Sequence, residues 1–106
     1  MHIYIAGKIT GLDENAAKLK FHNAALMIAR KGHIPLDPIE SVDQDPDRAW
    51  EDCMIDGIEI LICSATAIYM LPDWQASRGA RIEHAIAREL GYQIFYAETD
   101  LPRGME

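Results

Sequence analysis

Long apolar runs are missing from this 106-residue sequence, and none reaches the roughly 20 residues that a membrane-spanning helix needs. Cysteine is scarce as well: Cys53 and Cys63 lie ten positions apart. That spacing fits neither a zinc knuckle nor a redox pair, so we expect both to be buried free thiols. The first residues lack a basic segment followed by an apolar one, so we expect no signal peptide. Together these absences favour a cytoplasmic protein with no membrane partner.

Positive charge is also in short supply. Ten Lys and Arg residues stand against 17 Asp and Glu residues, which gives a formal net charge of −7. Such a balance opposes binding to long nucleic acid, because phosphate contacts need a basic face. It does not exclude a small nucleotide held by local N–H groups and by a cation such as Lys8, Arg78 or Arg81.

Neither a metal nor a cofactor is indicated. The four histidines show no metal-ligand spacing, and Glu83-His84 does not make a zinc-protease pattern. We therefore expect no metal site and no bound cofactor.

What the sequence does contain is an alternation of short apolar runs and amphipathic stretches. The pattern predicts strands at residues 2–6, 33–36, 65–71 and 93–97, and helices at 14–31, 45–63 and 77–91. Residues 39–44 are expected to be irregular. The alternation predicts an α/β fold, a three-layer, flavodoxin- or Rossmann-like parallel sheet of four to five strands with helices on both faces. Residues 1–106 are expected to form a single domain.

Residues that typically begin or end helices support these predicted boundaries. Asp13 is placed to cap the first helix, and Gly32 to end it in the left-handed conformation. Asp45-Pro46-Asp47 has the composition of a helix start. The last helix is expected to bury a face formed by Ile82, Ala85, Ile86 and Leu90.

The loops at the carboxyl ends of the strands predict where a ligand would bind. In parallel sheets the ligand crevice lies there, and here the loops are 7–11, 37–44 and 72–79. A helix that begins at Ser77 offers N–H groups and its positive end to an anion. Glu83 leans back over Gly79 and Ala80, neither of which can pair with it. We interpret Glu83 as an ionised carboxylate beside an open hollow, which is typical of a site.

These residues also carry a resemblance to a known family. The segments concerned are Ile3-Tyr4-Ile5-Ala6-Gly7, Ile9-Thr10-Gly11, the helix start at Trp50, and Leu71-Pro72-Asp73-Trp74 with Ser77-Arg78-Gly79-Ala80 and Glu83. Together they resemble a small, largely uncharacterised phage and bacterial family. That family is similar in fold to the nucleoside 2-deoxyribosyltransferases and the 2′-deoxynucleoside 5′-phosphate N-hydrolases. The resemblance to the small family covers nearly the whole chain.

The resemblance implies roles for individual residues. Glu83 would attack the anomeric carbon of a deoxyribose and displace the base, while Tyr4 would hold the carboxylate. Ser77 would help to bind a 5′-phosphate, together with the loop Gly7, Lys8, Ile9, Thr10 and Gly11. The N–H groups of Gly79 and Ala80 suit the same phosphate. Trp74 is either a pocket wall that stacks on the base or a packing anchor.

Two departures from the related enzymes concern the leaving group and the phosphate. The segment Cys63-Ser64-Ala65-Thr66 holds no acid before the third strand, so Asp56 is the nearest substitute for a general acid. Thr10 stands where the monophosphate hydrolases have an arginine.

The predicted function is therefore cleavage or transfer of the N-glycosidic bond of a (deoxy)nucleoside or nucleoside 5′-monophosphate through a glutamate nucleophile. The alternatives are a non-catalytic nucleotide-binding or sensing module, and cleavage of NAD-type N-glycosidic bonds. A pocket built on two loops would be shallow, so we expect a homodimer or homotetramer in which a neighbour closes the site.

Overall fold

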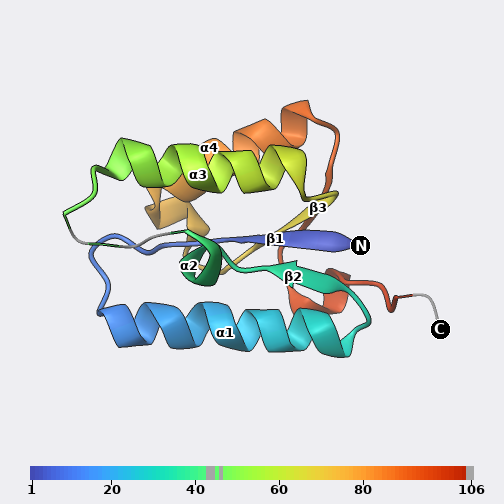
Figure 1. Ribbon diagram of the computed structural model, residues 1–106. Coiled ribbons are helices and arrows are strands. Elements are labelled where there is room, and N and C mark those ends of the chain that lie inside the picture. Colours follow the sequence, from blue (N-terminus) through green and yellow to red (C-terminus); the bar gives the residue numbers. More distant parts are fainter. Residues whose placement is uncertain (43–44, 46, 105–106) are drawn as a thin grey trace.

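The computed structural model describes residues 1–42, 45 and 47–104 of the chain. The described strands form one parallel sheet (Figure 1). They are β1 (His2–Ala6), β2 (Ile34–Leu36), β3 (Ala67–Met70) and β4 (Gln93–Phe95), in the order β2-β1-β3-β4. Ile3 of β1 is in register with Pro35 of β2 and with Ala67 of β3. The order reverses between β1 and β3, which is the switch point where flavodoxin-like sheets bind ligands.

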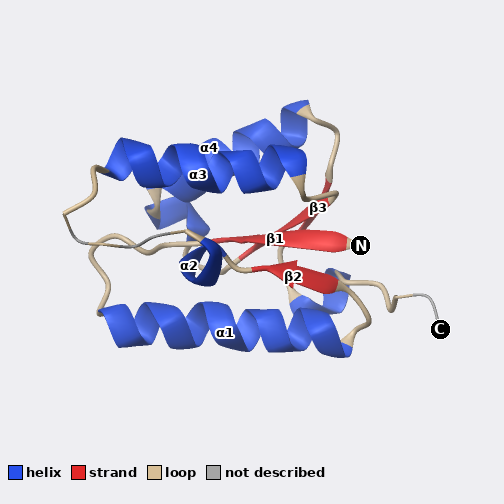
Figure 2. Cartoon of the chain, in the orientation of Figure 1, coloured by secondary structure: helices blue, strands red, loops and turns tan. Residues whose placement is uncertain are grey.

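The helices cover both faces of this sheet. Helix α1 (Glu14–Arg30) lies on one face, and α3 (Trp50–Cys63) and α4 (Arg78–Glu89) lie on the other (Figures 1 and 2). Right-handed crossovers require this arrangement, because the chain moves one way from β1 to β2 and the opposite way from β2 to β4. The short helix α2 (Pro38–Ser41) and the 3₁₀ turns Trp74–Ala76 and Glu98–Asp100 complete the described elements. The predicted three-layer α/β fold is confirmed.

The caps of α1 follow the sequence signals. The carboxylate of Asp13 accepts a hydrogen bond from the Ala16 N–H at 3.0 Å. Gly32 follows the helix with φ +89°, a backbone conformation that side chains with a Cβ rarely adopt. Both predictions are confirmed, because caps depend on residues only a few positions apart.

The predicted start of α3 was wrong. The helix begins at Trp50, and the Asp45 carboxylate instead accepts the Asp47 N–H at 2.9 Å, which caps a turn before the helix. Pro46 lies outside the described residues.

Two other boundaries also differ from the sequence prediction. Residues 39–41, expected to be irregular, belong to α2, because Asp37 accepts the Ile39 N–H at 2.9 Å and caps a helical turn. Residues 43 and 44 lie outside the described residues. Strand β3 is shorter than the expected 65–71.

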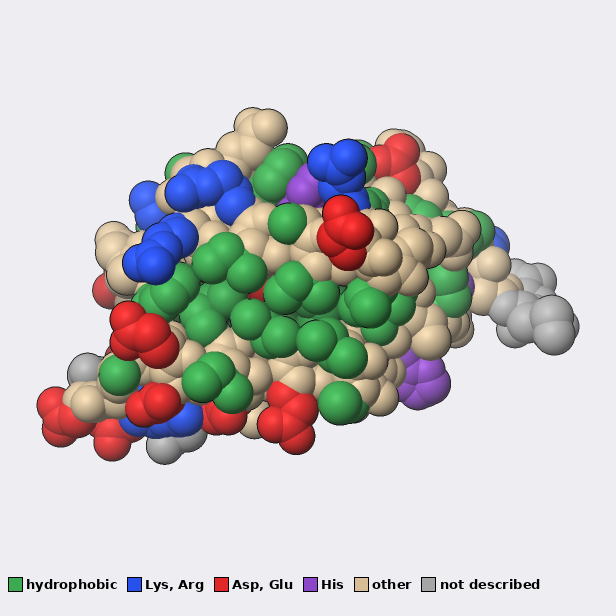
Figure 3. Space-filling model, turned by 90° about the horizontal axis from the view of Figure 1, so that it is seen from above, with side chains coloured by type: hydrophobic (Ala, Val, Ile, Leu, Met, Phe, Trp, Pro, Cys, Tyr) green, Lys and Arg blue, Asp and Glu red, His purple; other side chains and the backbone are tan. Residues whose placement is uncertain are grey.

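The buried face of α4 also differs from the predicted one. Gly79, Ala80, Glu83 and Ala87 are buried, whereas Ile82 and Ile86 are half-buried and Ala85 and Leu90 are exposed. Small residues allow the helix to approach its neighbours closely: a Cβ on Gly79 would lie 2.8 Å from the sulfur of Met54. Ile82 and Ile86 keep part of their surface exposed, and Figure 3 shows a broad apolar area on this side of the molecule.

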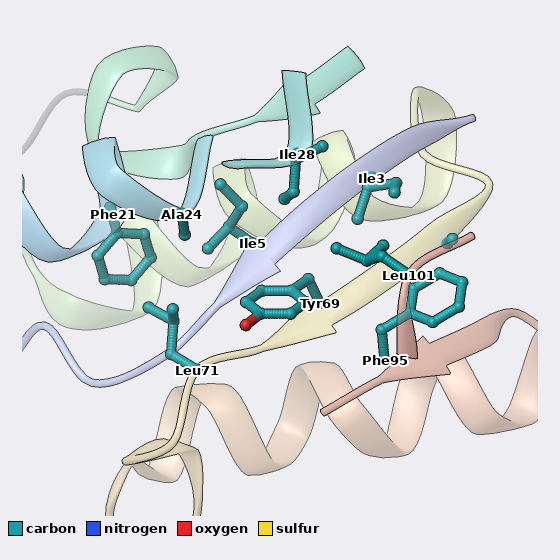
Figure 4. Packing of buried hydrophobic residues seen from close by; sticks show 10 residues of the cluster. Ile3, Ile5, Phe21, Ala24, Ile28, Tyr69, Leu71, Phe95 and Leu101 are labelled. Atoms are coloured by element: carbon teal, nitrogen blue, oxygen red, sulfur yellow. The ribbon is translucent and has the colours of Figure 1, made fainter. Parts of the chain in front are cut away.

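Two apolar clusters pack against the two faces of the sheet. Ile3 and Ile5 point toward α1, where Phe21 and Ile28 cover them (Figure 4). Successive residues of a strand point to opposite faces, so Tyr4 lies in the second cluster, on the side of α3 and α4. This alternation places a tyrosine hydroxyl beneath the two helices.

Candidate active site

Glu83 and Tyr4 form a buried pair between α4 and the centre of the sheet. Glu83 is only 7% exposed, and the Tyr4 hydroxyl donates a short hydrogen bond to its Oε2 atom. The pair exists because β1 is a central strand and α4 crosses above it with its small-residue face inward. The carboxyl group is therefore held in one orientation.

Gly57 of α3 provides the space for this pair. A Cβ at Gly57 would lie 2.9 Å from the Tyr4 hydroxyl oxygen and 3.3 Å from Glu83 Oε2. Any other residue would push against both groups. Glycine in a helix interior costs about 0.5–1 kcal/mol relative to alanine, so its presence here fits a position where a side chain has no room.

Burial raises the pKa of Glu83 to about 7, although the hydrogen bond from Tyr4 acts to lower it. From the sequence, we expected the N-terminus of α4 to keep the Glu83 carboxylate ionised. Glu83 lies in the second turn of α4, whereas the helix dipole acts mainly within the first, so burial has the larger effect on its pKa. Burial, followed by the charge of Glu83, raises the pKa of Tyr4 well above its usual range, so the tyrosine remains a donor.

A cavity of about 540 Å³ opens beside the pair. Its volume lies within the range of roughly 300–1,000 Å³ that is usual for small-molecule pockets. The walls come from β1, the loop after it, the start of α1, α2, α3 and the start of α4. Of the residues singled out in the sequence, those that line it are Tyr4, Gly7, Ile9, Thr10, Gly11, Ser77, Gly79, Ala80 and Glu83.

Three of the other candidates do not line this cavity. The Asp56 carboxylate accepts a hydrogen bond from Arg48 at 2.9 Å and is half-exposed. Trp74 stacks on His84, with ring centroids 4.3 Å apart, on another side of α4. Lys8 also lies outside the cavity wall. The structure therefore does not bring Asp56, Trp74 or Lys8 to the Glu83 carboxyl.

Lys8 instead takes part in a clamp between two loops. Its N–H donates to Asp73 at 3.1 Å, and Lys20 donates both to Asp73 and to the Lys8 carbonyl. Burial acts to raise the pKa of Asp73, but the bonds from Lys20 and the Lys8 N–H hold it below its usual value. The clamp fixes the loop after β1 against the loop after β3, and both loops reach the cavity.

The start of α4 offers a ligand fewer N–H groups than expected. The Ser77 side-chain oxygen accepts the Ala80 N–H at 3.1 Å, and the Ser77 carbonyl accepts the Arg81 N–H at 3.0 Å. The Ala80 N–H, expected to hold a phosphate, is thus already engaged as part of the helix cap. The remaining groups of the first turn are the N–H groups of Arg78 and Gly79 and the hydroxyl proton of Ser77.

One wall of the cavity, formed by α3 and the residues before it, was not predicted from the sequence. Trp50, Cys53, Met54 and Gly57 line the cavity, and so do Asp45 and Arg48. The guanidinium of Arg78 lies over the Trp50 ring at 4.3 Å and joins the starts of the two helices. Gly57 was the available signal, because a glycine inside an apolar helix pattern often indicates a close approach.

Both cysteines are free, but Cys53 is half-buried and Cys63 is exposed, so the expectation that both thiols are buried was wrong. Residues 1–42, 45 and 47–104 contain neither a metal-binding cluster nor a membrane-spanning helix. Within them, no group of three or more His, Cys, Asp or Glu side chains could hold a metal ion. No helix there is both long enough and apolar enough to cross a bilayer.

Comparisons with known proteins show the fold and the family. A solved structure described as a 2-desoxiribosyltransferase from Leishmania mexicana aligns over 88% of this chain with a TM-score of 0.62 and 20% sequence identity. The chain spans 61% of the length of that protein, and at this identity the likeness shows a shared fold. No curated protein matches the sequence. Residues 1–96 match DUF4406, described as a domain of unknown function, and the chain belongs to that family.

Proposed function

We propose that this chain cleaves the N-glycosidic bond of a nucleoside or nucleoside 5′-monophosphate and passes the sugar to water or to a second base. One observation carries the proposal: a buried glutamate, held by a tyrosine, lines a cavity large enough for a nucleoside. The likeness in fold to a deoxyribosyltransferase supports the same choice of substrate class.

The chemistry needs one nucleophilic oxygen. Tyr4 binds Oε2 of Glu83, which leaves Oε1 to attack the anomeric carbon. The new C–O bond forms as the C–N bond to the base breaks, and the bonding electrons leave with the base, which takes up a proton. Water or a second base then attacks the same carbon, gives a proton back to the group that protonated the first base, and releases the Glu83 carboxylate. Two displacements at one carbon give net retention of configuration.

The departing base needs a proton donor. Asp56, expected from the sequence, faces Arg48 outside the cavity wall. Among the described wall residues, the carboxylic acids other than Glu83 are Glu14 and Asp45. Glu14 and Asp45 are therefore both candidates for the donor.

A non-catalytic nucleotide sensor is the second candidate. It is favoured by the position of Asp56, which leaves the predicted leaving-group acid away from the carboxyl pair. Such a module would bind the same ligands and release no base. Cleavage of an NAD-type N-glycosidic bond is a third possibility, since it would use the same glutamate chemistry.

A direct assay separates these functions. The purified chain is incubated with deoxynucleosides, their 5′-monophosphates and NAD, and free base is followed by chromatography. We expect base release by the wild type, and a loss of more than about 1,000-fold in Glu83→Gln. Glu89→Gln is the matched control, because Glu89 is an exposed acid of the same helix.

The outcomes are distinct. Full activity in Glu83→Gln would exclude the assigned nucleophile. Thermal stabilisation by a nucleotide without turnover would establish the sensor. Neither turnover nor stabilisation by any of these compounds would refute both candidates.

A further inference from the structure

The outer side of the α3/α4 layer carries an apolar stripe. Ile55 and Ile62 of α3 are 61% and 48% exposed, which is high for isoleucine. Beside them, Ile58, Ile82 and Ile86 are half-buried and Ala85 is exposed. We call these six residues the α3/α4 face; Figure 3 shows the apolar area that this side of the molecule presents. Contiguous apolar surface of this kind marks interaction sites.

Opposite charges lie on the two helices that form this face. Helix α3 contains four acids and no Lys or Arg, whereas α4 contains three arginines and two acids, of which Glu83 is buried and Glu89 exposed. Asp52 and Glu59 are exposed on α3, and Arg81 and Arg88 are exposed on α4. Each pair is seven residues apart, which is two helical turns or about 10.5 Å. Figure 3 shows basic side chains along one edge of the apolar area and acidic ones mainly along the other.

Asp52, Glu59, Arg81 and Arg88 take part in none of the ion pairs that the described residues form. No ion pair among the described residues joins an acid of α3 to an arginine of α4. The Arg81 guanidinium donates to the Gln75 carbonyl, at 2.8 Å. The acidic and the basic edge are therefore both available to a partner.

We propose that a second copy of this chain docks on the α3/α4 face, with α3 of each copy against α4 of the other. Both helices run against the strand direction, because each connects the end of one strand to the start of the next parallel strand. They are thus parallel to one another. If the twofold axis of the dimer is parallel to these helices, the helices of the second copy run in the same direction. The basic edge of each copy then lies opposite the acidic edge of the other. Asp52 then approaches Arg81 of the second copy, and Glu59 approaches Arg88.

The α3/α4 face is complementary to itself, and for this reason we propose a second copy of the chain as its partner. A twofold interface uses the same patch twice, so the patch must contain both halves of every contact. The α3/α4 face meets that requirement through its equal spacing of acids and bases about a shared apolar stripe. A twofold axis across the helices would instead place acid against acid and base against base.

The docked copy would also support the cavity. Trp50, Met54 and Gly57 line the cavity from the inner side of α3, and Ile55, Ile58 and Ile62 lie on its outer side. Packing of a second copy against the outer side of α3 would keep the inner side of α3 in contact with the Tyr4–Glu83 pair. The dimer itself does not depend on the proposed function.

Charge reversal tests the pairing by sedimentation velocity at micromolar concentration. One variant carries Asp52→Lys and Glu59→Lys, and a second carries Arg81→Glu and Arg88→Glu. We expect a dimeric wild type and monomers of each variant, because each would oppose like charges. An equimolar mixture, or all four changes in one chain, restores opposite charges at every contact and should restore the dimer.

Controls separate this interface from general damage. Ile62→Glu should give a monomer, whereas Leu19→Glu should not, because Leu19 is 60% exposed on α1, on the opposite face of the sheet. Far-ultraviolet circular dichroism reports whether each variant folds. A monomeric wild type, or charge-reversed variants that keep the wild-type mass, would overturn the proposal. Failure of both the mixture and the fourfold variant to associate would overturn the α3-to-α4 pairing.

Discussion

Tyr4 and Glu83 lie 79 positions apart in the chain and share a buried hydrogen bond. Neither residue reaches the other through local structure: one comes from the first strand and the other from the last described α-helix. The bond aims one carboxyl group at the cavity, and burial sets its pKa near neutrality. Most of the testable chemistry of this protein follows from that pair.

The first prediction concerns the pH dependence of activity. A nucleophilic Glu83 must be ionised, and its pKa is raised to about 7. We therefore expect ionisation of Glu83 to increase kcat/KM for base release as the pH rises from about 6 to about 8. Tyr4→Phe removes a bond that lowers this pKa, so its profile should shift to higher pH. Rates measured across a series of buffers would show this, and a wild-type rate that falls across the same range would contradict it.

The second prediction concerns stability. The pKa of Glu83 is higher in the folded chain than its ordinary value of 4.5, so folding favours the protonated form. Stability is then lost as the pH rises from the ordinary pKa through about 7. Glu83→Gln has no charge to bury, so it should exceed the wild type by up to about 3 kcal/mol above pH 7 and by little at pH 4. Urea unfolding at both pH values measures the difference, and an equal difference at both would contradict the argument.

The third prediction concerns Gly57. Alanine there places a methyl group 2.9 Å from the Tyr4 hydroxyl, so the pair or α3 must move. Overpacking of this kind typically costs about 1–3 kcal/mol, against a gain of under about 1 kcal/mol in helix propensity. We expect lower thermal stability and slower base release. Glu51→Ala, at an exposed position of the same helix, should leave both near wild type; a Gly57→Ala variant as active as wild type would show that the pair tolerates the methyl group.

The fourth prediction separates two candidate proton donors. Asp45 lines the cavity and Asp56 does not. Loss of a general acid typically lowers a rate by about 100- to 10,000-fold, so Asp45→Asn should slow the release of base from poor leaving groups. Asp56→Asn should change that rate little, although it removes the partner of Arg48. The reverse ranking would restore the assignment made from the sequence.

Features that depend on neighbours in the chain were predictable from the sequence. The alternation of strands and helices, the Asp13 cap and the turn at Gly32 all come from segments of a few residues to a few turns. The carboxyl-end position of the cavity also followed, because parallel strands with right-handed crossovers leave few arrangements. Asp45 shows the limit of such signals, since its carboxylate caps a turn as readily as a helix.

The tertiary structure alone decided what surrounds Glu83. Helix α4 has a face of small residues and a face of isoleucines, and the apolar pattern favoured burying the larger face. The small face is buried instead, because only Gly79 and Ala80 allow α4 to lie this close to α3 and the sheet. That packing buries Glu83, raises its pKa and leaves Ile82 and Ile86 half-buried. Composition and periodicity determine that such faces exist, whereas the depth to which one helix can pack against another determines which of them is buried.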